Sequence, residues 1–317
     1  LDVAPEADFL SQPAAETFAA HVADPALASG DAVGAYRIVR ELGRGGMGVV
    51  YLAERPDVGL RAAVKVLSGP VADDDALDPD LERFCEERRH LAALGHPGVA
   101  QLYDAGRTAD GRPYFVMEFV EGEPITAYAD RRRLGLRDRA DLFVQLCEAV
   151  RHVHGRGVVH GDVKPDNVLV ADDDEGRPVA KLLDFGVAAR WRDAEAPPLP
   201  HRPFTYVYTA PELVAGGAPT LASDVYALGV VLRDLVEGAP RSRNGLDARL
   251  DALAARATSP HVGHRPATAV DLLAEVRASL RMEPRRPSVA VSNTALLALM
   301  AVSALASAAV ARALGRG

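Results

Sequence analysis

Residues 36–120 carry the alternation of apolar and polar side chains that is typical of paired strands with one buried face. Five segments show it: YRIVREL, VVYLAE, RAAVKVL, GVAQLYDAG and RPYFVMEFV. Between the third and fourth, from about residue 79 to 94, apolar positions recur at helical spacing instead. That helical set comprises Leu81, Phe84, Leu91 and Leu94, with Glu87 among them. We therefore expect a small lobe of five strands and one helix over residues 35–118.

Helical periodicity dominates from about Leu136 onward. It appears in RDRADLFVQLCEAVRHVHGRG, LASDVYALGVVLRDLVEG, LDARLDALAARA and TAVDLLAEVRASL. Among these helices, ADDDEGRP has the acids and the glycine of an exposed turn between two strands. The prediction is an α+β protein of two lobes, in which a hinge and a larger, mainly helical lobe occupy residues 119–283.

Both ends of the chain differ from this middle part. Residues 1–34 contain six Asp or Glu, no Lys or Arg and no continuous apolar run, which predicts an acidic mobile tail without a secretory signal. Residues 288–311 form 24 consecutive uncharged positions. As a helix they would measure about 36 Å, enough to cross a bilayer. After a basic, Pro-containing linker (284–288), we expect a single membrane span over 289–311 and a short tail over 312–317; a packed or amphipathic Ala-rich helix is the alternative.

The charge around this span favours one orientation. Arg281, Arg285 and Arg286 precede it, whereas Arg312 and Arg316 follow it. Because positive residues collect on the cytoplasmic side, the domain before the span is expected in the cytoplasm, attached to the cytoplasmic membrane.

Overall composition excludes some classes of partner. The 317 residues include 36 basic and 44 acidic side chains, so the chain has no basic footprint and nucleic acid is not an expected partner. Cys85 and Cys147 have no spacing that suggests zinc. Both are interpreted as buried apolar residues in a reducing compartment.

One short stretch, VVHGDVKPDNVLV at 158–170, concentrates reactive side chains. His160, Asp162, Lys164 and Asn167 fall within eight positions, between two runs of β-branched residues. We expect the runs to be short buried strands and the polar cluster to be a loop between them. A loop held in this way is a place for a functional site.

A glycine cluster and a lysine suggest a binding site for phosphate. The segment Gly43–Gly48 fits GxGxxG, and a strand rather than a helix follows it, which favours a flap folded over nucleotide phosphates. An ordinary glycine-rich hairpin is the alternative. Lys65 lies on the apolar strand AAVKVL, where an ammonium needs an anion. Glu87 and a ligand phosphate are the candidate partners, unless Lys65 reaches solvent from an edge strand.

Taken together, these segments resemble the eukaryotic-type protein kinase family. LGRGGMGVVYLAE, AAVKVL, HGDVKPDN, LLDFGVAA, YTAPEL and SDVYALGVVL occur in the order of that family, over residues 36 to about 280. The bacterial serine/threonine kinases are the most similar variety. The resemblance implies a protein-kinase-like fold that transfers the γ-phosphate of ATP to Ser/Thr hydroxyls of proteins, with self-phosphorylation possible.

The same resemblance implies roles for individual residues. Lys65 would contact the α- and β-phosphates and pair with Glu87. Asp162 would accept or orient the substrate hydroxyl proton, and Lys164 would neutralise the γ-phosphate. The metal ligands, for Mg²⁺ or Mn²⁺, would be Asn167 and Asp184. The ATP site would further comprise Leu42, Gly43, Arg44, Gly45, Gly46, Met47, Gly48, Val50, Ala63, Met117, Glu118 and Val120.

Within this implied site, Met117 would lie beside the adenine and the backbone at Glu118 and Val120 would bind its edge. As an alternative, Met117 is a core residue at a strand end.

Other matches imply structural roles. Glu212 is expected to form a buried ion pair with Arg265, and Asp224 to brace the catalytic loop from the helix beneath it. His160 is expected to pack, together with Leu91 and Phe185, rather than to transfer a proton.

Two departures from the family concern regulation. Gly161 stands where most of the family has an arginine that binds a phosphate on the activation loop, and no Ser, Thr or Tyr lies between Gly186 and Phe204. We therefore expect activity without phosphorylation of this loop. Phe204 and Tyr206 also replace the usual Gly and Pro, which leaves peptide specificity open.

Two rival functions follow from the same residues. HGD followed by Asn also resembles kinases of aminoglycosides and choline, and a pseudokinase scaffold would share the fold. The glycine flap, DFG, and APE with Arg265 favour a protein kinase over the first rival. Every catalytic position is filled, which disfavours the second.

Overall fold

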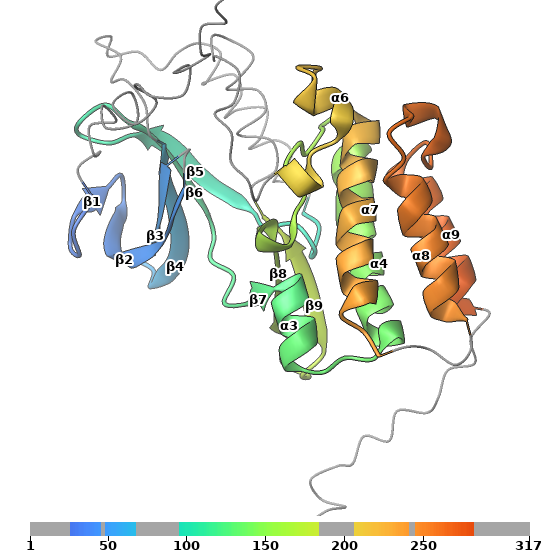
Figure 1. The fold of residues 1–317 in the computed structure, drawn as a ribbon. Coiled ribbons are helices and arrows are strands. Elements are labelled where there is room, and N and C mark those ends of the chain that lie inside the picture. Colours follow the sequence, from blue (N-terminus) through green and yellow to red (C-terminus); the bar gives the residue numbers. More distant parts are fainter. Residues whose placement is uncertain (1–25, 46–47, 68–94, 184–205, 241–244, 282–317) are drawn as a thin grey trace, which may run out of the picture. The chain divides into compact units, whose positions relative to one another are not determined.

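The computed structural model describes residues 26–45, 48–67, 95–183, 206–240 and 245–281 (Figure 1). The chain divides into two compact units, Leu1–Leu280 and Arg281–Gly317, and the fold below is that of the first. The helix expected over 79–94 and the membrane span expected over 289–311 lie outside the described residues. Within the residues that are described, no helix is long and apolar enough to cross a membrane.

The small lobe is an antiparallel sheet with the strand order β1-β2-β3-β4-β6-β5. Its strands are β1 (Ala32–Val33), β2 (Tyr36–Gly45), β3 (Gly48–Arg55), β4 (Leu60–Leu67), β5 (Leu102–Arg107) and β6 (Pro113–Glu118). The five strands expected from alternation are present. The sixth, β1, falls in the part interpreted as a mobile tail; a strand of two residues is too short to show a period.

Contacts before β1 also join that segment to the sheet. The Leu27 amide donates to the Tyr51 hydroxyl at 3.1 Å, and Leu27 packs on the same core as Val33. The ordered small lobe thus includes residues before 35.

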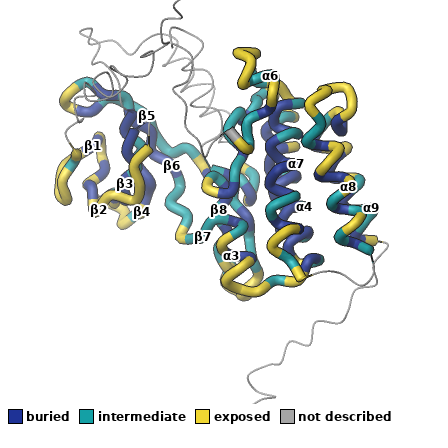
Figure 2. Tube along the Cα trace, in the orientation of Figure 1, coloured by how far each residue is buried: buried dark blue, intermediate teal, exposed yellow. Residues whose placement is uncertain are grey.

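The sheet buries different apolar sets on its two faces, and Figure 2 shows buried positions along its strands. One face carries the larger core, with Tyr51, Val64 and Val116 at its centre. The other carries a smaller cluster of Ala63, Leu67, Phe115 and Met117. Since side chains alternate between faces, Lys65 in β4 lies on the face of Ala63 and Leu67.

The larger lobe is mainly helical and contains a three-stranded sheet, in the order β7-β8-β9. Its elements are β7 (Glu123–Pro124), α3 (Ile125–Arg131), α4 (Leu136–His154), β8 (Val168–Asp172), β9 (Pro178–Leu182), α6 (Pro211–Val214), α7 (Leu221–Glu237), α8 (Leu246–Ala257) and α9 (Ala269–Arg281), with single 3₁₀ turns at Pro165–Asn167, Tyr206–Tyr208 and Val262–His264. The four helices expected from periodicity are α4, α7, α8 and α9. The acidic turn lies between β8 and β9, as expected.

Helix α7 is the centre of this lobe and packs against both α4 and α8 (Figure 1). Its side chains Val225, Leu228 and Leu232 are fully or almost fully buried. A Cβ on Gly229 would lie 2.6 Å from the Cβ of Ala257, so this glycine permits the close approach of α8. Cys147 of α4 is fully buried in the same core, and burial raises the pKa of its thiol.

A capping box fixes the start of α7. The Ser223 amide donates to Thr220 Oγ1 at 3.2 Å, and the Thr220 amide donates to Ser223 Oγ at 2.9 Å. These reciprocal bonds satisfy two amides at the helix end. Asp224, in the first turn, is therefore held in a defined place.

One local prediction was wrong. Val158 and Val159 form no strand; they are half-buried residues that follow the end of α4 and lie outside any helix or strand. A β-branched pair favours an extended backbone, but a strand also needs a partner, and in the described residues β8 pairs with β7 and β9 instead.

Candidate active site

The loop after α4 brings together three of the predicted site residues: Asp162 and Lys164, expected in catalysis, and Asn167, expected to bind metal. Asp162 Oδ2 accepts from Lys164 Nζ at 2.7 Å and from Asn167 Nδ2 at 2.9 Å. Asn167 Nδ2 also donates to the backbone oxygen of Asp162 at 2.7 Å. The Asp162 side chain remains 29% exposed. It is therefore a carboxylate of fixed orientation that a substrate can still reach.

His160 supports this loop from within the core. It is fully buried, its Nε2 donates to the Leu183 carbonyl at 2.9 Å, and its Nδ1 accepts the Asp162 amide at 3.2 Å. The hydrogen therefore lies on Nε2, and both ring nitrogens are occupied. This arrangement agrees with the predicted packing role; Leu91 and Phe185, its expected neighbours, lie outside the described residues.

Asp224 anchors the same loop from α7. Its Oδ2 accepts the His160 amide and its Oδ1 accepts the Gly161 amide, both at 2.8 Å. His154 Nε2, at the end of α4, completes the set at 2.8 Å from Oδ2. The Asp224 side chain is 1% exposed, so its charge depends on these donors. The predicted bracing is thus present, whereas sequence reasoning missed His154.

A cleft of about 690 Å³ lies beside this loop. Of the residues expected at the ATP site, it is lined by Leu42, Gly43, Val50, Ala63, Met117, Glu118, Val120 and Asn167. Leu169 of β8 and Leu183 also line it. Sequence reasoning missed these two, because apolar residues in or beside a strand look like ordinary core.

A bulge in β2 accounts for the place of Leu42. The pairing of β2 with β3 shifts between Glu41 and Gly43, which leaves Leu42 outside the ladder. Such a bulge turns a side chain away from its regular direction. Leu42 is 37% exposed and lines the cleft, where an apolar surface suits a flat base.

The glycine segment joins β2 to β3, with Gly45 paired to Gly48. Gly48 has φ +142°, and a Cβ there would overlap the Val66 carbonyl oxygen. Around Gly43 and Gly45 a Cβ would meet nothing within 4 Å, so an approaching anion could reach this backbone. The exposed Arg44 pairs with Glu41 at 2.9 Å.

Four of the predicted site residues lie outside the described residues: Gly46, Met47, Glu87 and Asp184.

Lys65 is described and lies in β4. It is opposite Val50 and Phe115 in the sheet and shares a face with Ala63, which lines the cleft.

Asn167 has the chemistry to hold a hard cation. Its amide nitrogen is committed to Asp162, and no hydrogen bond from the described residues reaches its side-chain oxygen. Oxygen is the ligand that Mg²⁺ prefers. The Leu183 amide donates to the Asn167 carbonyl at 2.8 Å, which keeps the backbone at Leu183 close to Asn167.

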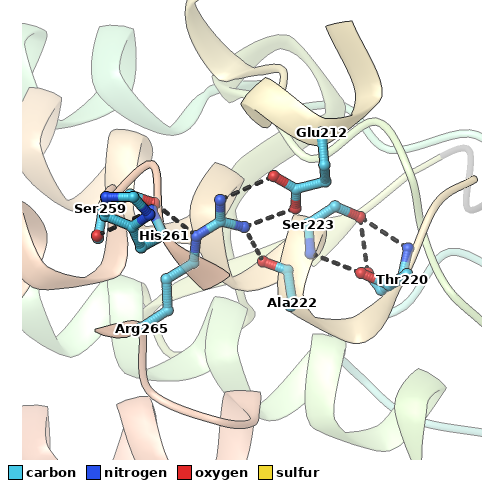
Figure 3. A network of polar contacts seen from close by, with 7 residues as sticks. All are labelled: Glu212, Thr220, Ala222, Ser223, Ser259, His261 and Arg265. Atoms are coloured by element: carbon cyan, nitrogen blue, oxygen red, sulfur yellow. Dashed lines mark hydrogen bonds and ion pairs between the residues drawn. The ribbon is translucent and has the colours of Figure 1, made fainter. Parts of the chain in front are cut away.

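The expected ion pair between Glu212 and Arg265 is confirmed (Figure 3). Arg265 Nη1 lies 2.7 Å from Glu212 Oε1, and Nη2 lies 2.8 Å from Oε2. The guanidinium also donates to the carbonyls of Ser259 and Ala222, and its side chain is fully buried. This hydrogen bonding lowers the pKa of Glu212, against the effect of burial.

Tyr208 fixes the segment before α6. Its hydroxyl donates to Asp234 Oδ2 of α7 at 2.7 Å. Burial, followed by this bond, raises the pKa of Tyr208, and burial raises the pKa of Asp234. Residues 206–208 are therefore tied to the central helix near the catalytic loop. No local sequence pattern indicates this pair.

This arrangement of lobes, cleft and loop is that of a phosphotransferase, and comparison with known proteins identifies the family. A model of the protein kinase domain matches residues 36–284, and the chain belongs to this family. The serine/threonine-protein kinase Pkn1 of Myxococcus xanthus is 36% identical over 280 residues, covering 84% of this chain and 38% of that protein. PknA of Mycobacterium tuberculosis is 39% identical over 213 residues, covering 65% of this chain and 47% of that protein.

A solved structure shows the same two-lobed protein kinase fold. The PknI kinase domain of Mycobacterium tuberculosis is 29% identical, with a TM-score of 0.59, over 80% of this chain and 100% of that one. This chain spans less than half the length of the two curated relatives.

Proposed function

We infer that this domain is a serine/threonine protein kinase, which transfers the γ-phosphoryl group of ATP to hydroxyls of protein substrates. The observation that carries the inference is the fixed group of Asp162, Lys164 and Asn167 beside the cleft. The names of the curated relatives support the class of acceptor. The relatives and the solved structure above are protein kinases, and they support neither the small-molecule kinase nor the pseudokinase alternative.

The transfer forms a bond between the substrate oxygen and the γ-phosphorus and breaks the bond to the bridging oxygen, so that ADP leaves. Asp162 orients the attacking hydroxyl and can take its proton. Lys164, 2.7 Å from that carboxylate, is placed to meet the negative charge of the γ-phosphate.

Cations complete the proposed site. Kinases of this family use ATP with a divalent metal, and Asn167 and Asp184 are the proposed ligands in this chain. When bound, Mg²⁺ or Mn²⁺ neutralises phosphate charge. Lys65 is proposed to contact the α- and β-phosphates and to pair with Glu87. The backbone of Gly43 and Gly45 is proposed to cover the phosphates.

The proposed adenine site lies between the lobes at Met117. The Glu118 amide already donates to the Gln101 carbonyl at 2.8 Å, so a base would meet the Glu118 carbonyl instead. The Val120 amide has no partner among the described residues and can donate to the base. Leu42 and Leu169 would face the base from two different elements.

Membrane attachment through residues 289–311 is also proposed, from their length without charge. The test compares the full chain with one that ends at Pro284. The full chain should stay with membranes after a carbonate wash, and the shorter one should be soluble. Release of the full chain by the wash would favour a packed helix.

The class of acceptor is tested by incubating the domain with ATP and Mg²⁺ or Mn²⁺. Generic protein substrates and aminoglycosides should be offered in parallel, and products located by mass spectrometry. Phosphoserine or phosphothreonine is expected. Phosphorylated aminoglycoside alone would support the small-molecule alternative, and no transfer to any acceptor would support the scaffold.

A further inference from the structure

Lys181 is a lysine that the proposed mechanism does not use. The chain contains three lysines among its 36 basic residues, and the other two, Lys65 and Lys164, are the predicted phosphate contacts. Lys181 lies in β9 opposite Leu169, which lines the cleft. Its side chain is 24% exposed, so its ammonium is largely withdrawn from water and needs an anion.

That anion is Glu118, the last residue of β6. Glu118 Oε1 forms an ion pair with Lys181 Nζ, and Oε2 accepts the Gln101 amide at 3.4 Å. The Glu118 side chain is 23% exposed and lines the cleft. Because Glu118 and Val120 are the proposed contacts of the base, an interaction that fixes Glu118 also fixes those contacts.

Together with backbone hydrogen bonds, the ion pair links the end of β6, strand β9 and residues 98–101. Leu182, the neighbour of Lys181, accepts the Ala100 amide at 2.9 Å and donates to the Gly98 carbonyl at 2.8 Å. Gln101 then connects back to Glu118 through the 2.8 Å bond between Glu118 N and Gln101 O. These other links are made by backbone, so the ion pair is the link that a substitution can remove.

We propose that Lys181 is a positioning residue for nucleotide binding, which neutralises Glu118 and holds it against β9 so that residues 118–120 are ready to receive the base. The proposal rests on the proposed function. Lys181 is not among the residues that line the cleft, so its effect passes through Glu118. The adenine base is bound in both the ground state and the transition state. Loss of Lys181 should therefore weaken nucleotide binding more than it lowers turnover.

The first test is a double-mutant cycle on nucleotide affinity and kinetics. Lys181→Met leaves a partly buried carboxylate unpaired and should raise the Kd and KM for ATP about tenfold, with kcat within about twofold. Glu118→Gln together with Lys181→Met removes the same ion pair without leaving an unpaired charge, so its loss of affinity should be no larger than that of Lys181→Met alone. If the fold-change in Kd for the double variant equalled the product of the two single-variant changes, the proposal would be overturned.

Two further variants separate this role from general destabilisation. Lys181→Arg keeps the charge and should bind ATP within about threefold of wild type. Arg177→Met removes a cation from the other end of the same hairpin, where Arg177 pairs with Asp173 at 2.9 Å but is 71% exposed. That control should change neither constant. An equal loss of affinity in Arg177→Met and Lys181→Met would contradict a specific role for Lys181.

The small number of lysines allows a test that does not depend on catalysis. Limited acylation of amines, followed by mass spectrometry, should modify Lys181 slowly in wild type and at least threefold faster in Glu118→Gln. Equal rates would show that the ion pair does not form in solution. If the wild-type protein bound no ATP, both proposals would be overturned. If wild type and Lys181→Met bound ATP with the same Kd, only the proposal for Lys181 would be overturned.

Discussion

Gly161 donates its backbone amide to Asp224 Oδ1 at 2.8 Å, across 63 positions of sequence. The residue adopts φ +76°, a left-handed conformation that glycine reaches without strain. A carboxylate on the central helix therefore holds the backbone next to Asp162. The geometry of the catalytic loop depends on the core of the larger lobe as well as on the loop itself.

Asp224→Asn should impair both stability and turnover. An amide offers one acceptor atom where the carboxylate serves three donors, so at least one buried N–H loses its partner. A buried unsatisfied group costs about 1 to 3 kcal/mol. Urea unfolding should report this loss, and kcat should fall at least tenfold while the Kd for ATP stays within about threefold. A variant with full kcat would show that the anchor does not position Asp162.

The unmodified domain should already be active. Gly161 cannot bind a loop phosphate through a side chain, and residues 187–203 contain no hydroxyl to carry one. Treatment with a broad phosphatase, followed by its removal, should leave the initial rate of transfer unchanged. A fall of tenfold or more, about 1.4 kcal/mol in transition-state stabilisation, that preincubation with ATP restores would contradict this account.

The pair of Glu212 and Arg265 should make stability depend on acid. Arg265 lowers the pKa of Glu212 below the usual 4.5 of a glutamate, so the folded state favours the ionised form. This contribution is fully present above pH 4.5 and is lost as the pH falls through the lowered value. Glu212→Gln should flatten the dependence of unfolding free energy on pH below 4.5. At pH 7 it should cost about 3 to 5 kcal/mol, because Arg265 stays buried and charged. If the unfolding free energy of Glu212→Gln depended on pH below 4.5 as wild type does, the stabilising role assigned to ionised Glu212 would be contradicted.

The glycine segment offers a matched pair of substitutions. Gly48→Ala places a methyl group against the Val66 carbonyl at φ +142°, so it should lower the unfolding free energy by about 2 kcal/mol or more. Gly45→Ala meets no neighbour within 4 Å and should leave stability within about 0.5 kcal/mol. Instead it should raise the KM for ATP, since the methyl group occupies space next to the proposed phosphate contact. Equal losses of stability in both variants would contradict the different surroundings assigned to Gly48 and Gly45.

Much of the fold was predictable, because long elements repeat their period. Helices α7 and α8 begin and end within one residue of their sequence patterns. β1 was missed since two residues show no period, and a strand was wrongly expected at Val158 because β-branched residues alone do not supply a pairing partner.

The candidate site was predictable where residues are close in sequence. Asp162, Lys164 and Asn167 share one loop, and the structure brings them into contact. Contacts made by folding alone were not visible. Lys181 is 63 positions from Glu118, and Tyr208 is 26 positions from Asp234, so no local pattern joins them.

The role of Asp162 is tested most directly by comparing wild type with Asp162→Asn in one assay. The γ-phosphate of labelled ATP should be followed onto a protein substrate with Mg²⁺, and ATP affinity measured on the same samples. Asp162→Asn should lower kcat by about 10²-fold to 10⁴-fold, because the carboxylate that orients the hydroxyl is lost. The Kd for ATP should stay within about threefold, since Asp162 makes no proposed contact with phosphate. Wild-type turnover in Asp162→Asn would contradict the proposed mechanism.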